Sequence, residues 1–173
     1  MVENGFLLSS EAVFNLIQSV YRSADTFAAD FAQEYPSVAA LRERIGDLQK
    51  RPGSLFLVVR EGGELLGYLF IVPRMAAKLR HTADLNMGMR AEARGRGLGG
   101  ALCKAALSRL RRDRIVEIVY LMVRADNAPA LRLYKNHGFE VLAILEQDTK
   151  IAERYYDGVL MRLRVRSGGC QSL

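Results

Sequence analysis

The sequence has few of the residues that build disulfide frameworks and metal centres. Its 173 residues include two cysteines and two histidines, and no tryptophan. Two cysteines cannot form a disulfide framework, and with only His81 and His137 beside them we expect no metal site. We interpret Cys103 as a small buried residue of a helix and Cys170 as an exposed thiol near the end of the chain.

Long hydrophobic runs are also missing. No apolar run approaches the roughly 20 residues that a membrane-spanning helix needs. The apolar run in the N-terminal MVENGFLLSS is too short for a secretory signal peptide. Half of the residues are hydrophobic and a quarter are charged, which is the composition of an ordinary soluble enzyme. We therefore expect a cytoplasmic protein with no membrane partner, built as one domain over residues 1–166 with a short flexible tail at 167–173.

Positive charge is in excess and unevenly placed. The formal net charge is +6, and the stretch from Arg90 to Arg114 holds eight basic residues against Glu92 and Asp113. A second basic patch lies at 162–166. The plain interpretation is a solvated helix face and strand edge, and the alternative is a site for coenzyme phosphates or nucleic acid. Because the long run contains no aromatic residue for base stacking, we do not expect nucleic acid as the partner.

The hydrophobic pattern predicts a mixed α/β fold. Helical periodicity covers residues 9–23, 37–50, 98–113 and 127–137. Two apolar runs that join around Gly62 and Gly63 predict a hairpin. Further strands are expected at 5–8, 81–89, 115–123, 139–145 and 155–165. This order predicts a central mixed sheet flanked by about four helices, rather than a doubly wound parallel sheet.

The stretch RGRGLGG, residues 94–100, has the spacing G-x-G-x-x-G at Gly95, Gly97 and Gly100. A dinucleotide-binding unit would also need a carboxylate at the far end of the following strand, whereas Glu117 lies near its beginning. No Lys-Ser/Thr pair follows the glycines, which excludes a Walker loop. A glycine-rich turn that enters a helix still lets several backbone N–H groups point at one anion. The stretch therefore favours a phosphate site, with a plain packing turn as the alternative.

Two motifs together resemble the GNAT family of N-acetyltransferases. MGMRAEARGRGLGGAL is similar to the family's Arg/Gln-x-x-Gly-x-Gly/Ala signature, through Arg94, Gly97 and Gly99. DNAPALRLYKNHGFE resembles the second motif, an Asn-led helix that ends in Leu-Tyr-x-x-x-Gly-Phe. The motifs come in the family's order, and the expected elements fit the GNAT fold over almost the whole chain. One departure is Ala91, where many members have proline.

Within the family, the sequence most resembles the amino-acid N-acyltransferases, in RHTADLNMGM and RYYDGVLM among other segments. Ribosomal-protein and peptide N-terminal acetyltransferases are a second match, but those peptide enzymes carry a glutamate where this chain has Met122. The resemblance implies transfer of an acetyl group from acetyl-CoA to a primary amine. The favoured acceptor is a small molecule such as an amino acid, and a protein N-terminus or lysine is the alternative. A non-catalytic domain that binds acetyl-CoA or nucleic acid is a third hypothesis.

The resemblance also assigns roles to individual residues. Tyr134 matches the general acid that protonates the departing thiolate, and its presence favours catalysis; packing in the core is the alternative role. Asn127 would cap its helix and bond the pantetheine arm, with Pro129 in the first turn. The backbone of Met87, Gly88 and Met89 would bond the pantetheine amides, and the pyrophosphate would bind beside Arg94, Gly95, Arg96, Gly97, Leu98, Gly99 and Gly100.

The residues do not single out a general base. Asp84 and Glu117 are ionisable residues in predicted strands, His81 lies just before one, and an ordered water chain could serve instead. Strand alternation places Asp84 on one face with Asn86 and Gly88. Asp84 is our first choice and His81 the second.

Aromatic residues in the first part of the chain could line an acceptor pocket, although core packing is the more common use of such residues. They are Tyr21, Phe27, Phe31, Tyr35 and Tyr68. Later, the segment of Tyr155, Tyr156 and Asp157 resembles a Tyr-x-Asp segment of amino-acid acetyltransferases. We interpret it as a feature of the fold or of a homodimer as much as of the substrate site.

Overall fold

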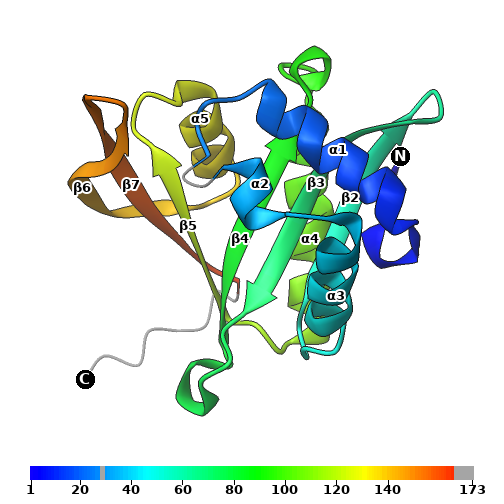
Figure 1. Cartoon of the computed structure of the whole chain (residues 1–173). Helices are drawn as coiled ribbons and strands as arrows, with labels where there is room; N and C mark the ends of the chain where they lie inside the picture. The colour runs from blue at the N-terminus through cyan, green and yellow to red at the C-terminus, as the bar shows by residue number, and fades with distance from the viewer. Residues whose placement is uncertain (28–29, 166–173) are drawn as a thin grey trace.

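Seven strands form one mixed sheet in the computed structural model, which describes residues 1–27 and 30–165 (Figure 1). They are β1 (Val2–Asn4), β2 (Leu55–Glu61), β3 (Glu64–Pro73), β4 (Thr82–Met89), β5 (Ile118–Arg124), β6 (Glu140–Ile151) and β7 (Arg154–Arg164). The order across the sheet is β1-β2-β3-β4-β5-β7-β6, and only β4 and β5 are parallel neighbours. The predicted tail at 167–173, with Cys170, lies outside the described residues.

Five helices of the described chain flank the sheet: α1 (Ser10–Arg22), α2 (Phe31–Glu34), α3 (Val38–Gln49), α4 (Leu98–Asp113) and α5 (Ala128–Asn136). Figure 1 shows α1 and α3 on one face of β2, β3 and β4, and α4 on the other. Leu16 and Phe56 are buried on the first face, and Leu57 and Leu102 on the second. None of these helices is long and apolar enough to cross a membrane.

The local predictions for the helices and the hairpin are confirmed. Ser9 and Ser37 cap α1 and α3, and each side chain accepts a hydrogen bond from a backbone N–H of the first turn. Gly62 and Gly63 form the turn between β2 and β3 with φ values of 57° and 88°. Gly138, with a φ of 88°, follows the end of α5.

The start of the chain differs from the prediction. The prediction of a strand at 5–8 is wrong. The first strand is β1, and the residues that follow it form a 3₁₀ turn at Gly5–Leu7. Gly5 packs directly on Phe56, so that a Cβ at this position would lie 2.6 Å from the phenyl ring. The short helix α2 was not expected, because four residues are too few to show a helical period.

Two strand boundaries also differ. β5 begins at Ile118, so Glu117 precedes the strand that was expected to contain it. Its N–H donates to the carbonyl of His81 at 2.7 Å, and its carbonyl accepts from the N–H of Val165 at 2.8 Å. The final hairpin, β6 and β7, extends beyond the predicted segments at its turn. The side chains of β6 are almost all exposed, so this part of the hairpin lacks the apolar alternation that would have predicted it.

Candidate active site

β4 and β5 run side by side over only three residue pairs. These pairs end at Asp84 and Tyr120, and Figure 1 shows the two strands diverging beyond them. Residues 87–89 of β4 pair with β3 on one edge and, among the described strands, have no partner on the other. A free strand edge offers backbone N–H and C=O groups to an extended ligand. The edge of β4 is therefore available in the manner expected for a pantetheine arm.

Gly88 also has a packing role within this stretch. A Cβ at Gly88 would lie 2.7 Å from Val20 of α1 and 2.8 Å from the ring of Tyr68. Glycine thus lets α1 and β3 approach the backbone of β4 closely. This close packing fixes the position of the free edge relative to α1.

The glycine-rich stretch forms the turn that enters α4. Gly95 and Gly97 have φ values of 72° and 77°, a conformation that glycine adopts without steric cost. Gly97 is the N-cap of α4, and no side chain caps this helix. The three residues after Gly97 therefore have backbone N–H groups without a helical partner, at the positive end of the helix dipole. This arrangement fits a phosphate group.

The same turn lies against α5, which carries the second motif. A Cβ at Gly99 would lie 3.3 Å from Cδ2 of Leu133, and one at Gly100 would lie 3.5 Å from Cε1 of His137. The ring of His137 is fixed by its Nδ1, which lies 2.8 Å from the carbonyl oxygen of Leu133. The two motifs, distant in sequence, are thus neighbours in the fold.

α5 places the predicted tyrosine inside the molecule. Asn127 caps the helix by accepting a hydrogen bond from the N–H of Ala130 at 3.2 Å, and Pro129 lies in the first turn. Tyr134 is buried and packs edge-to-face on Phe139, with ring centroids 5.5 Å apart. Burial raises the pKa of the Tyr134 phenol above its usual value. The phenol therefore keeps its proton at neutral pH, as a general acid must.

The two arginines predicted beside the phosphate have partners within the chain. Arg94 donates to the hydroxyl of Ser23 at 2.8 Å and to the carbonyl of Met89 at 3.3 Å. Arg96 forms an ion pair with Glu61. Arg94 therefore links the end of α1 to the end of β4, and Arg96 would have to leave or share Glu61 to contact a phosphate.

The candidate bases lie in different environments. Asp84 receives two hydrogen bonds from Arg74, at 2.8 and 3.2 Å, and is partly exposed. It shares its face of β4 with Asn86, which lines a pocket, but is not itself among the lining residues. His81 is exposed, and both it and Glu117 lie at the opposite end of β4 and β5 from the point where these strands diverge.

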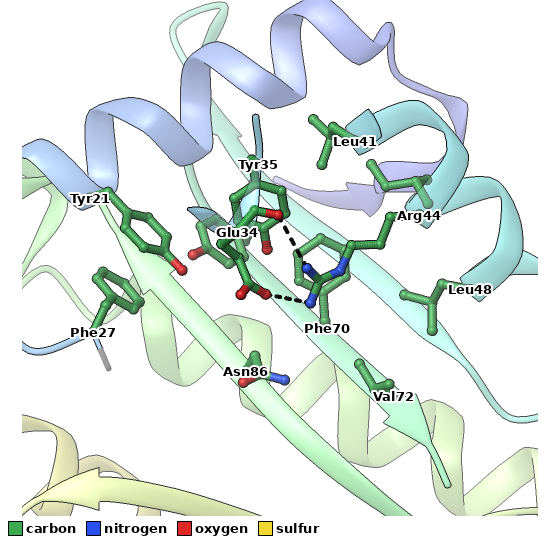
Figure 2. A pocket seen from close by; sticks show the side chains of 12 residues that line it. Tyr21, Phe27, Glu34, Tyr35, Leu41, Arg44, Leu48, Phe70, Val72 and Asn86 are labelled. Carbon is green, nitrogen blue, oxygen red and sulfur yellow. Dashed lines mark hydrogen bonds and ion pairs between the residues drawn. The ribbon is translucent and has the colours of Figure 1, made fainter. Parts of the chain in front are cut away.

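A pocket of about 110 Å³ lies between α1, α2, α3 and strands β3 and β4 (Figure 2). Four of the five aromatic residues considered for an acceptor site line it: Tyr21, Phe27, Tyr35 and Tyr68. Phe31 instead packs on neighbouring rings, including that of Phe14 at 5.0 Å between centroids. Burial raises the pKa values of all three tyrosines, so their hydroxyls remain neutral donors.

Glu34 and Arg44 supply the charged groups of this pocket, and the sequence did not single them out. Nη2 of Arg44 lies 2.5 Å from Oε1 of Glu34, and Nη1 donates to the backbone carbonyl of Glu34 at 3.4 Å. Dashed lines in Figure 2 mark the contacts between these residues. Glu34 ends α2 and Arg44 lies in α3, and they meet because the chain turns sharply between these helices. The one available signal was the ten-residue separation of opposite charges across Pro36, which alone predicts no contact.

Within residues 1–27 and 30–165, no three side chains of His, Cys, Asp or Glu gather as a metal ion would need.

Comparison with known proteins gives consistent results. Residues 12–139 match the sequence profile of the acetyltransferase (GNAT) family. The chain is 27% identical over 128 residues to an L-amino acid N-acetyltransferase of Escherichia coli, covering 74% of this chain and 77% of that protein. It is also 27% identical over 151 residues to an L-methionine sulfoximine/L-methionine sulfone acetyltransferase of Pseudomonas aeruginosa, covering 86% and 87%. The fold of a Sinorhizobium meliloti phosphinothricin acetyltransferase in complex with AcCoA superposes with a TM-score of 0.86 at 17% identity, over 99% of this chain and 91% of that one.

Proposed function

Because the chain belongs to the acetyltransferase (GNAT) family, which uses acetyl-CoA, we propose that it acetylates the primary amine of a free amino acid. The predicted fold class and family are confirmed. One observation carries the choice of acceptor: the pocket is small and has Asn86 of β4 in its wall. The acceptor would thus lie beside the strand whose free edge suits the acetyl donor. The named activities of the relatives support the same choice.

Acetyl-CoA supplies an acetyl thioester, and the amine replaces the thiol to give an amide and free CoA. The amine has to be neutral to attack, so the protein must accept its proton. We propose Asp84 for this role, acting through water because Asp84 is not among the residues that line the pocket. Tyr134 would hold a proton at its phenol oxygen for the departing sulfur.

The residues that would hold acetyl-CoA follow the two motifs. The backbone N–H groups at the start of α4, after Gly97, would bind the pyrophosphate. The free edge of β4 at 87–89 would bond the pantetheine amides. Asn127, besides capping α5, would contact the same arm. Arg94 would support the site by holding the end of β4 to α1.

The first experiment is calorimetric titration of CoA, acetyl-CoA and, as a control, NAD. It is followed by a thiol-release screen over amino acids, polyamines and short peptides. Binding of acetyl-CoA without NAD, with the largest kcat/KM among free amino acids, is the expected result. Acetyl-CoA binding with peptides as the best acceptors would instead support protein N-terminal acetylation. Binding of acetyl-CoA without any turnover would show that the protein is a non-catalytic domain that binds acetyl-CoA.

We further propose that the protein is cytoplasmic, where acetyl-CoA and free amino acids occur together, and that residues 1–166 act as one domain. A homodimer formed through β6 is a related proposal. β6 is the last strand of the described sheet and carries the exposed apolar residues Val141, Leu142, Ile144 and Leu145. An apolar edge strand is prone to pair with another chain. Light scattering should show a dimer that Ile144→Lys dissociates, while Leu7→Lys, at an exposed apolar position away from β6, leaves it intact.

A further inference from the structure

We propose that Glu34 and Arg44 bind the acceptor as a zwitterion, with its carboxylate on Arg44 and its ammonium group on Glu34. This inference rests on the proposed acetylation of amino acids and makes it more specific. It identifies the acceptors as free, neutral α-amino acids with apolar side chains. It excludes peptides, amino-acid amides and simple amines as good substrates.

The pocket wall contains one pair of opposite charges. Among the described residues that line the pocket, Glu34 and Arg44 are the charged ones, and the remaining wall is aromatic, aliphatic or amide. The guanidinium of Arg44 also lies over the ring of Tyr35, with Cζ 5.2 Å from the ring centroid. Figure 2 shows the side chains of Glu34 and Arg44 turned toward the same space as Asn86. The charges are therefore presented to the pocket rather than away from it.

The two charges that face the pocket balance each other. One negative and one positive group face the pocket, so the site as a whole is neutral. A zwitterion can insert between them and replace one ion pair with two, leaving no charge unpaired. An amine without a carboxylate would displace Arg44 from the carboxylate of Glu34 and leave the guanidinium without a charged partner. A ligand with an extra charged group would leave that group against the apolar wall.

The rest of the pocket is small and mostly apolar. The pocket volume of about 110 Å³ is somewhat smaller than the roughly 150 Å³ engineered cavity that binds benzene. It suits a compact ligand whose polar head reaches the charged pair. Phe27, Phe70 and Val72 provide apolar surface for an aliphatic side chain. A longer peptide would place the amide of its second residue, rather than a carboxylate, beside Arg44.

The expected effect is moderate because the pair is not fully buried. The side chains of Arg44 and Glu34 are 56% and 28% exposed, so solvent weakens their attraction for a ligand. We expect the loss of the carboxylate to lower kcat/KM by about tenfold to 100-fold.

The test compares L-leucine with L-leucinamide and 3-methylbutylamine, which share its side chain but lack the carboxylate. The wild-type protein should prefer leucine by about tenfold to 100-fold in kcat/KM. The amine of leucinamide is less basic, hence more often neutral, so its intrinsic reactivity cannot explain a lower rate. Arg44→Gln should abolish the preference for leucine by raising its KM, while leucinamide improves because its ammonium group no longer has to displace Arg44 from Glu34.

Two further variants separate ligand binding from a structural role of the ion pair. Arg42→Gln is the matched control, because Arg42 lies in the same helix in an exposed ion pair with Glu11 at 3.3 Å, and it should leave all three acceptors unchanged. The double variant Glu34→Arg/Arg44→Glu keeps an ion pair but reverses its direction. It should fold and bind acetyl-CoA, yet fail to restore the preference for leucine. Restoration of leucine activity by this reversal would overturn the inference.

The outcomes also separate this inference from the proposed function. Equal kcat/KM for leucine, leucinamide and 3-methylbutylamine in the wild type would overturn the zwitterion inference while leaving acetyl transfer in place. Absence of transfer to any amine would count against the proposed function instead. In that case calorimetric binding of leucine against leucinamide still tests the inference, and equal affinities would overturn it.

Discussion

Asp84 of β4 and Tyr120 of β5 are the last aligned pair before these parallel strands separate. Arg74 joins both, donating two hydrogen bonds to Asp84 and placing its Cζ 4.8 Å from the ring centroid of Tyr120. The three residues thus lie where the two strands begin to diverge. Beyond them lie Asn86 in the pocket wall and the free edge at 87–89. A change at this point should alter chemistry without removing the acetyl-CoA site.

The first prediction concerns Asp84. If Asp84 accepts the proton of the amine, Asp84→Asn should lower kcat at neutral pH. It should also displace the rising limb of the pH–rate profile toward higher pH, because base from the solvent must then accept the proton. The rate of thiol release, measured over a range of pH, gives this profile. Asp113→Asn, which alters an exposed carboxylate at the end of α4, is the control. A profile that superimposes on the wild type would move the role to His81 or a water chain.

The second prediction concerns the glycine turn. Gly97→Val should cost about 1–2 kcal/mol of backbone strain at a φ of 77° and place a side chain beside the exposed amides of α4. Affinity for CoA should fall about tenfold for each backbone hydrogen bond lost, as calorimetry can measure. Gly63→Val is a strain control, since Gly63 has a φ of 88° in the turn between β2 and β3 and, like Gly97, would place a Cβ with no atom within 4 Å. Unchanged CoA affinity in Gly97→Val would show that the turn serves only packing.

Much of this site was predictable from sequence because its signals are local. A cap such as Ser37, a turn such as Gly62 and Gly63, and the spacing around Gly97 each act through backbone geometry within a few residues. The contact of Glu34 with Arg44 is different. It depends on the angle between a four-residue helix and α3, and no periodicity or spacing encodes that angle. The ion pair of Asp84 with Arg74 was missed for a similar reason, since strand register across a loop decides it.

The third prediction concerns Tyr134. Tyr134→Phe should lower kcat by about 100-fold to 10,000-fold at neutral pH, because the departing thiolate loses its proton donor. Affinity for acetyl-CoA should stay near the wild-type value, since the ring still packs on Phe139. Tyr155→Phe, at an exposed position on β7, is the matched control and should leave kcat unchanged. An unaltered kcat in Tyr134→Phe would show that Tyr134 serves only in core packing.

The fourth prediction concerns alkaline stability. Burial between α4 and the sheet raises the pKa of the Cys103 thiol from 9.0 to about 12. The buried thiol therefore keeps its proton at a pH where the thiol of the unfolded chain has lost it. Its contribution to stability is complete below pH 9.0 and is lost as the pH rises toward about 12. In that window it lowers the free energy of unfolding by up to about 1.4 kcal/mol per pH unit.

Urea unfolding from about pH 8 to about pH 11 measures this slope. Cys103→Ser keeps nearly the same shape but has no group that ionises in this range, so its unfolding free energy should fall less steeply above pH 9.0. The difference in unfolding free energy between the two proteins at neutral pH reports packing and hydrogen bonding. Only the slope of the unfolding free energy against pH reports ionisation of the thiol. Equal slopes for the two proteins would mean that the thiol ionises as readily in the folded state. The side of α4 that packs near Tyr134 would then admit water.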